Sequence, residues 1–266
     1  MSSDVEQVVA FMEAQRPLQA ARFPTVVAPK VLAFMGTTSR PGTFAGVSVH
    51  RIRGVDPGPS APELSLRLAG PLPRPPAAGE CLSVHVTRLE QYLGYQLKTR
   101  PVAEGVEPPL VQEGDALLVR GSQLFTVHHS PYTLRFFESI PFDEVRELVA
   151  GASHALVAVG ETANLSPRFV FHHEVVDGRL ALFHGDGLAL KTFMNLRQNP
   201  QETRLLLDLD GWRGFALRGT VRELREAEHP AARERLLAGF ASAGWGQPSR
   251  CFRFLADSIE PIAPIG

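Results

Sequence analysis

The chain has few cysteines and almost no net charge. Its two cysteines, Cys81 and Cys251, lie far apart and belong to no CxxC pair, which excludes a disulfide framework and argues against a zinc site with regular ligand spacing. A net charge of −1 over 266 residues is far from the strongly basic balance of a non-specific nucleic-acid binder. We therefore expect no nucleic-acid partner and no metal site.

Long hydrophobic runs are missing as well. No run approaches the ~18 uncharged apolar residues that a membrane-spanning helix needs. The first residues, Met1 to Asp4, carry an acid where a signal peptide carries a base. These features predict a cytoplasmic protein with no membrane partner.

Proline and glycine are plentiful, with 22 and 23 residues, whereas the chain has only three tyrosines and two tryptophans. Such a composition is typical of many short elements joined by turns, and it favours β structure with a few helices, an α+β class that is mainly β. The length suits two modules of roughly 130 residues each. We place the boundary after a predicted helix at 142–149, because a new apolar run starts at Ala155, and so expect modules 1–150 and 151–266.

The first module begins with a predicted amphipathic helix, because Val5, Val8, Val9 and Met12 recur at helical spacing. β-Branched and alternating segments follow it. They predict short strands at residues 31–35, 43–55, 64–68, 82–86, 95–99, 116–119, 124–127 and 133–136.

The second module shows a clearer order of elements. Asp177-Gly178 lies between two apolar runs, 168–173 and 180–184, and Asp-Gly between strands is a strong hairpin signal. A helical segment, Lys191 to Arg197, stops at Asn199-Pro200, where proline forbids continuation. We then expect a hairpin of strands 205–209 and 215–221, a helix at 231–240, and a last strand at 252–259.

The segment from Gly185 to Pro200 has the parts of a phosphate site. A glycine-containing turn leads into a helix whose first turn carries Lys191 and Thr192. Free N–H groups and the positive end of the helix dipole add to that lysine and hydroxyl. The pattern is not a Walker A loop, and an ordinary β-to-helix turn with an exposed lysine is the alternative interpretation.

With its flanks, this half resembles the flavin-binding split-barrel family of pyridoxamine 5'-phosphate oxidase-like proteins, over roughly residues 152–260. The segment Arg168-Phe169-Val170 looks like the family's Arg-x-Val strand. The segment Lys191 to Pro200, with Asn195-Leu196 and Asn199-Pro200, looks like its phosphate-binding turn and helix. Two strands then follow in the family's order, the second with Arg218-Gly219-Thr220.

The resemblance implies a split β-barrel that binds FMN and oxidises or reduces a small organic substrate. The flavin phosphate would be held by Arg168, Lys191 and Thr192, and His173 would lie near the flavin. The cofactor-binding residues that the resemblance implies are Arg168, Val170, His173, Lys191, Thr192 and Arg218. No catalytic residue is assigned, because the isoalloxazine ring itself carries the hydride.

Two departures from the family pattern bear on this expectation. Thr192 stands where the family has the second residue of a basic pair, which predicts a weaker or altered flavin site. The arginine- and histidine-rich element that holds the substrate phosphate in true pyridoxamine 5'-phosphate oxidases has no counterpart around residues 249–253. We therefore expect another substrate.

The order of strands in the first half echoes the second, so it is interpreted as a diverged barrel without a phosphate turn. Family members generally form dimers, which predicts either a homodimer or a pseudo-dimer within one chain. The alternatives left open are a non-catalytic barrel that binds flavin or haem, and a deazaflavin in place of FMN. The pairs His128-His129 and His172-His173 invite a metal hypothesis, but adjacent strand residues point to opposite faces.

Overall fold

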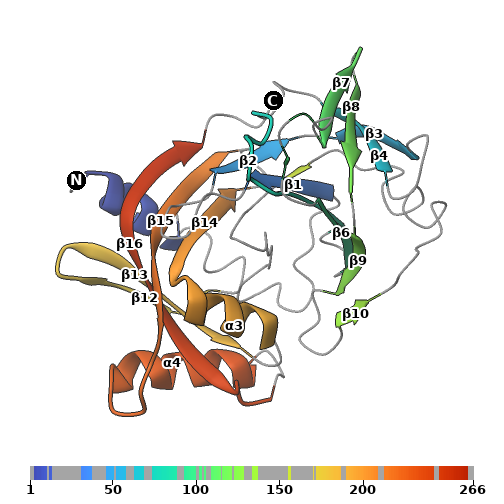
Figure 1. The fold of residues 1–266 in the computed structure, drawn as a ribbon. Coiled ribbons are helices and arrows are strands. Elements are labelled where there is room, and N and C mark those ends of the chain that lie inside the picture. Colours follow the sequence, from blue (N-terminus) through green and yellow to red (C-terminus); the bar gives the residue numbers. More distant parts are fainter. Residues whose placement is uncertain are drawn as a thin grey trace. The chain divides into compact units, whose positions relative to one another are not determined.

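The chain is mainly β with few helices, as the composition predicts, and all its described strand pairs are antiparallel (Figure 1). Its contacts divide it into two compact units. Unit 1 comprises Met1–Val26 and Ser166–Ala263, and unit 2 comprises Val27–Leu165 and Pro264–Gly266. The computed structural model describes residues 3–10, 12–13, 31–37, 46–50, 52–57, 63–68, 74–88, 93–99, 102–103, 105, 109–114, 116–121, 123–128, 134–136, 155–156, 170, 172–186, 190–208, 213–242 and 246–262.

The residues described at the start of the chain, 3–10 and 12–13, are helical, which confirms the predicted N-terminal helix. They belong to unit 1 together with the second half of the sequence. The division into modules 1–150 and 151–266 stays a prediction, because a unit defined by contacts is not thereby an independently folding domain. The predicted helix at 142–149 lies outside the described residues.

Unit 1 is built on a five-stranded sheet of order β12-β13-β16-β15-β14, in which strands distant in sequence are neighbours. Its strands are β12 (His172–Val176), β13 (Arg179–Asp186), β14 (Gln201–Asp208), β15 (Arg213–Glu223) and β16 (Arg250–Ile262). Helix α3 (Leu190–Gln198) joins β13 to β14, and α4 (Pro230–Ser242) lies between β15 and β16 in the chain. Both helices confirm the sequence prediction. Within the part of the chain that is described, no helix is long and apolar enough to span a membrane.

The β12–β13 hairpin turns at Asp177-Gly178, as expected. Both residues have positive φ, 51° and 74°, which is the conformation a two-residue hairpin turn needs. The first strand was expected at 168–173, and that range is wrong: Val170 is not in a strand, and β12 begins at His172. Pairing starts at the turn, where Val176 lies opposite Arg179. The strand therefore includes Glu174 and the residues between it and the turn, which the expected range left out.

Strand β13 is buried on both faces because apolar side chains cover each of them. Leu182 belongs to a core that also contains Val8 of the N-terminal helix. Phe183, on the other face, belongs to a second core with Leu236 of α4. All of these side chains are fully buried, so burial at roughly 25 cal/mol per Å² of apolar surface is the main term that holds the layers together.

The long pair β15–β16 contains a bulge. Arg218 pairs with Ser258 and Gly219 with Ala256, which leaves Asp257 as an extra residue in β16. A Cβ atom at Gly219 would collide with the backbone oxygen of Leu255. The glycine is therefore required by close approach of the two strands.

Unit 2 contains two sheets. The seven-stranded sheet has the order β1-β2-β11-β5-β6-β9-β10, and the four-stranded sheet has the order β3-β4-β8-β7. The strands of the first are β1 (Val31–Thr37), β2 (Gly46–His50), β11 (Ala155–Leu156), β5 (Leu82–Arg88), β6 (Leu93–Lys98), β9 (Gln123–His128) and β10 (Leu134–Phe136). Those of the second are β3 (Ile52–Pro57), β4 (Glu63–Leu68), β8 (Ala116–Arg120) and β7 (Leu110–Glu113).

The single strand expected over 43–55 is wrong, since this stretch forms β2 and β3 in different sheets. β2 ends at His50 and β3 begins at Ile52, so the chain passes from one sheet to the other within two residues, and both of these residues are buried. A register shift between Ile52 and Gly54 bends the start of β3. Apolar periodicity alone does not reveal such a change of sheet.

The two faces of the β5–β6 pair differ in polarity. Ser83 lies opposite Lys98 and Val84 lies opposite Leu97, so successive pairs alternate between faces. Leu82, Val84, Val86 and Leu97 are buried on one face. Among the side chains that the structure describes, those buried on the other face are polar: Ser83, His85, Gln96 and Lys98.

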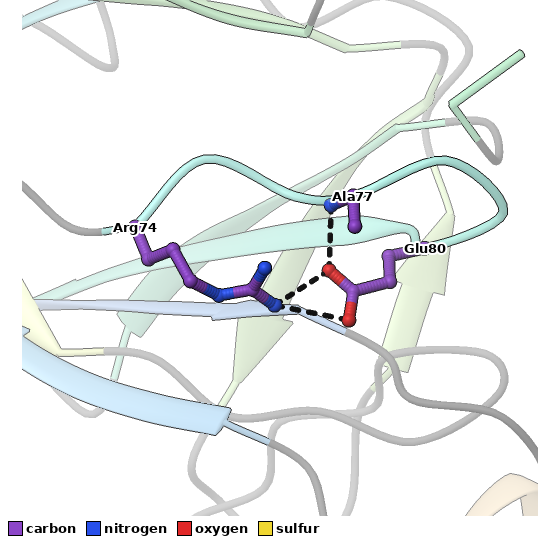
Figure 2. A network of polar contacts seen from close by, with 3 residues as sticks. All are labelled: Arg74, Ala77 and Glu80. Carbon is purple, nitrogen blue, oxygen red and sulfur yellow. Dashed lines mark hydrogen bonds and ion pairs between the residues drawn. The ribbon is translucent and has the colours of Figure 1, made fainter. Parts of the chain in front are cut away.

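The segment before β5, which contains Pro75 and Pro76, is held by one carboxylate. Arg74 donates from one NH2 group to both oxygens of Glu80, at 3.0 and 2.7 Å, and the backbone N–H of Ala77 donates to the same carboxylate at 2.6 Å (Figure 2). Gly79, with φ of 80°, turns the chain and donates to the carbonyl of Val102. These bonds position the start of β5.

Candidate functional site

The end of α3 is tied to the sheet through Asn199-Pro200. The N–H of Asn199 makes a last helical bond to Asn195 O at 2.8 Å, and proline then stops the helix. The side-chain oxygen of Asn199 accepts from the N–H of Gln201 at 3.1 Å, while Pro200 O accepts from Val221 of β15 at 2.8 Å. The Asn-Pro pair thus ends the helix and orients it against β14 and β15.

The start of α3 carries the predicted phosphate-binding residues. Lys191 and Thr192 follow Leu190 in the first turn, which contains no acidic residue. The first N–H groups of a helix lack partners within it and attract anions. The side chains of Lys191 and Thr192 are not among those described, and Arg168 lies outside the described residues altogether.

Val170, the neighbour of Arg168 in the proposed Arg-x-Val motif, packs on the same apolar core as α3. That core, centred on residues such as Leu182 and Phe254, is also contacted by Phe193 and Leu196 of the helix. The structure therefore brings Val170 and α3 to the same face of the unit 1 sheet.

The two histidines of β12 differ in their surroundings, as the alternation of a strand requires. His173 Nε2 lies 3.8 Å from Glu13 Oε1 of the N-terminal helix. His172 is buried and its ring centroid lies 5.4 Å from that of Phe183, on the α4 side. Among the described residues, no group of three or more histidine, cysteine or acidic side chains is arranged to hold a metal ion.

Arg218 lies on β15 and forms an ion pair with Glu260, with 3.5 Å between NH1 and Oε1. Its neighbour Leu217 is buried in the core that α3 contacts, so alternation puts Arg218 on the opposite face. The structure therefore does not bring Arg218 and α3 to one face of the sheet.

Two arginines that the sequence patterns did not single out lie close to the ring of Phe193 in α3. The guanidinium of Arg250, at the start of β16, lies 4.0 Å from the ring centroid of Phe193, and that of Arg197 lies 5.8 Å from it. No ion pair joins either arginine to a carboxylate whose side chain is described, and the side chain of Asp186, which stands opposite Arg250 in the β13–β16 register, is not among these. The Phe193–Arg197 contact follows from their i, i+4 spacing. Arg250 reaches the helix only because β16 pairs with β13, and no local pattern reveals that pairing.

A buried arginine lies deeper in the same unit. Arg204 of β14 donates from NH2 to His184 Nδ1 at 3.0 Å and from Nε to Glu202 at 3.1 Å. Its guanidinium carbon lies 4.5 Å from the ring centroid of Phe254. The carboxylate and the ring compensate the buried charge, and we assign these contacts to the core of unit 1.

Comparisons of the chain with protein-family models, with curated proteins and with solved structures found no match. The resemblance to the flavin-binding split-barrel family stays a prediction.

Proposed function

We propose that the chain is an FMN-dependent oxidoreductase of split-barrel type that acts on a small organic substrate. One observation carries the proposal: a strand, a helix with Lys191 and Thr192 in its first turn, and an Asn199-Pro200 stop that bonds onto β15. The Lys-to-Asn-Pro segment is the most specific part of the family resemblance. The order of strands and helices around it in unit 1 agrees with the order that the resemblance implies.

The residues around α3 fit the charge of a flavin phosphate. The first turn has no acid to repel it, and Arg197 and Arg250 place positive charge close to Phe193 of the helix. Lys191 and Thr192 would hold the phosphate together with Arg168, through charge-assisted hydrogen bonds. When bound, FMN supplies two-electron hydride chemistry, while the protein binds and orients it.

The proposal also covers how the barrel halves are paired and in which compartment the reaction takes place. Unit 2 serves as a diverged barrel half that lacks a phosphate turn, and the cofactor-binding half is paired either with it, as a pseudo-dimer, or with a second copy of the chain. The reaction takes place in the cytoplasm on a small-molecule substrate.

FMN binding to variants of α3 tests the cofactor assignment. We expect Lys191→Ala to weaken FMN binding about tenfold or more, because one charge-assisted phosphate contact is lost, and Thr192→Ala to weaken it less. The measurement is quenching of flavin fluorescence on titration with protein. Arg235→Ala, which removes an exposed cation from α4, is the control and should bind like the wild type. Equal FMN affinity in Lys191→Ala and the wild type would contradict the assignment.

A non-catalytic flavin-binding protein is the second candidate, and Thr192 favours it, because the first turn of α3 then carries one basic residue instead of two. Anaerobic mixing of the flavin-loaded protein with reduced nicotinamide separates the two functions. Bleaching of the flavin absorption supports the enzyme, whereas an unchanged spectrum with every common donor supports the binding protein.

A further inference from the structure

Three polar side chains from separate elements meet on the α4 face of unit 1. Glu174 comes from β12, His229 immediately precedes α4, and Arg253 comes from β16. His229 Nδ1 lies 3.3 Å from Glu174 Oε1, and His229 Nε2 lies 2.9 Å from Arg253 NH1. None of the three was singled out by the sequence patterns, because β12, α4 and β16 are far apart in the chain.

The geometry determines which nitrogen of His229 carries the proton. A guanidinium can only donate, so Nε2 must accept from Arg253 through its lone pair. The single proton of the neutral ring then lies on Nδ1, next to the Glu174 carboxylate. Glu174 thereby orients the imidazole, and His172 Nε2 lies 3.5 Å from its other oxygen.

The backbone at His229 is strained. Its φ is 48°, a left-handed conformation that non-glycine residues adopt at a cost, and Pro230 follows directly. Its carbonyl accepts the N–H of Arg233 at 2.9 Å, which anchors the start of α4. The ring packs against Phe183, with 5.7 Å between the ring centroids. These contacts hold the imidazole ring of His229 between Glu174 and Arg253 in one orientation.

Arg253 makes no direct ion pair with a carboxylate among the described residues, although Glu228 and Glu174 attract its charge from a distance. Its contact is a neutral imidazole, and its buried Nε has no hydrogen-bond partner in the described part of the chain. Burial, with the positive charges of Arg222 and Arg179, lowers the pKa of Arg253 from its ordinary value, and the carboxylates of Glu228 and Glu174 offset part of that shift. Arg222 stands directly opposite it in the β15–β16 register and is itself engaged by Glu228 at 3.0 Å. Arg253 is therefore a partly desolvated cation that an added anion would stabilise.

We propose that Arg253, positioned by His229 and Glu174, forms a binding site for an oxyanion group of a small ligand, a carboxylate or a phosphate. The guanidinium is the anchor, because it can present a fork of two donors to either group. The side chain of His229 is 26% exposed and Arg253 is also partly exposed, so the site is open to solvent. It lies on the α4 face, opposite the core that α3 contacts, and does not depend on the proposed flavin site.

The test titrates the full chain with two probes, inorganic phosphate and acetate. Binding is measured through the change in the NMR chemical shifts of the His229 ring. We expect at least one probe to bind saturably. Binding of both identifies a general oxyanion site, and binding of phosphate alone or acetate alone identifies the ligand group. Absence of saturable binding by both probes would overturn the proposal.

Variants show whether Arg253 is the anchor. We expect Arg253→Gln to weaken binding about tenfold or more and Arg253→Lys to keep part of it, because lysine retains the charge but not the fork. The exposed Arg235→Gln is the control and should bind like the wild type. Circular dichroism checks that each variant is folded. If Arg253→Gln does not fold, the affinity of Arg253→Lys is the deciding measurement. Wild-type affinity in a folded Arg253→Gln would contradict the proposal, whereas unchanged FMN binding in these variants would separate this site from α3.

Discussion

Strands β13 and β5 are equally buried but differ in what they bury. From Leu180 to His184, and from Leu82 to Val86, every side chain is at most 1% exposed. In β13 both faces are apolar from Leu180 to Phe183, and each packs on its own core. In β5 one face is apolar, while Ser83 and His85 make the other face polar.

The difference teaches that equal burial does not mean an equal source of stability. Apolar side chains gain from leaving water, whereas a buried polar group stabilises only when its partners are present. His85, Gln96 and Lys98 each interact with at least one partner. We infer that packing dominates around β13 and that hydrogen bonding and charge decide stability around β5.

The largest expected effect comes from the apolar strand. Phe183→Ala removes a fully buried ring between β12 and α4, and such substitutions cost about 3–5 kcal/mol because a cavity remains. Urea unfolding followed by circular dichroism measures the loss. A loss below about 1 kcal/mol would show that this face is not packed as described.

A smaller loss is expected from the polar face that β5 shares with β6. Gln96→Leu replaces a buried amide by an apolar side chain of similar size but leaves the partners of the amide unpaired, which costs about 1–3 kcal/mol. The same unfolding experiment measures it. Stabilisation by the leucine would mean that the polar face of β5 obeys the same rule as β13, and the comparison would fail.

Ser83→Ala is the matched control for that substitution. The Ser83 hydroxyl is fully buried and has no hydrogen-bond partner among the described residues. Its removal should change stability by less than about 1 kcal/mol, in either direction. A loss as large as that of Gln96→Leu would reveal that this hydroxyl has a partner after all.

The smallest effect concerns an exposed carboxylate of unit 1. The backbone N–H of Arg225 and then the side chain of Arg222 lower the pKa of Glu228 from its ordinary 4.5. A carboxylate with a lowered pKa stabilises the fold above its ordinary pKa and loses that effect as the pH falls through the folded value. Glu228→Gln should therefore be slightly less stable at neutral pH, and its difference from the wild type should vanish in acid. Thermal unfolding at several pH values measures this difference, and a constant difference would contradict the assignment.

Local patterns predicted the elements of unit 1 well. Asp177-Gly178 marked the β12–β13 turn, and Asn199-Pro200 marked the end of α3, because both signals act over a few residues. Long-range pairing was beyond such patterns. The contacts of Arg250 with Phe193 and of Arg253 with His229 depend on the pairing of β16 with β13 and β15. Alternation along β5 likewise did not reveal that its polar face is buried too.

The most direct test of the central claim, that unit 1 binds FMN, is the visible absorption spectrum of the freshly purified chain, with mass analysis of any small molecule released by heat. We predict bands near ~370 and ~450 nm and release of FMN. A single intense band near ~400 nm would indicate haem instead. A colourless protein that stays colourless after soaking with excess FMN and removal of the free flavin would contradict the account.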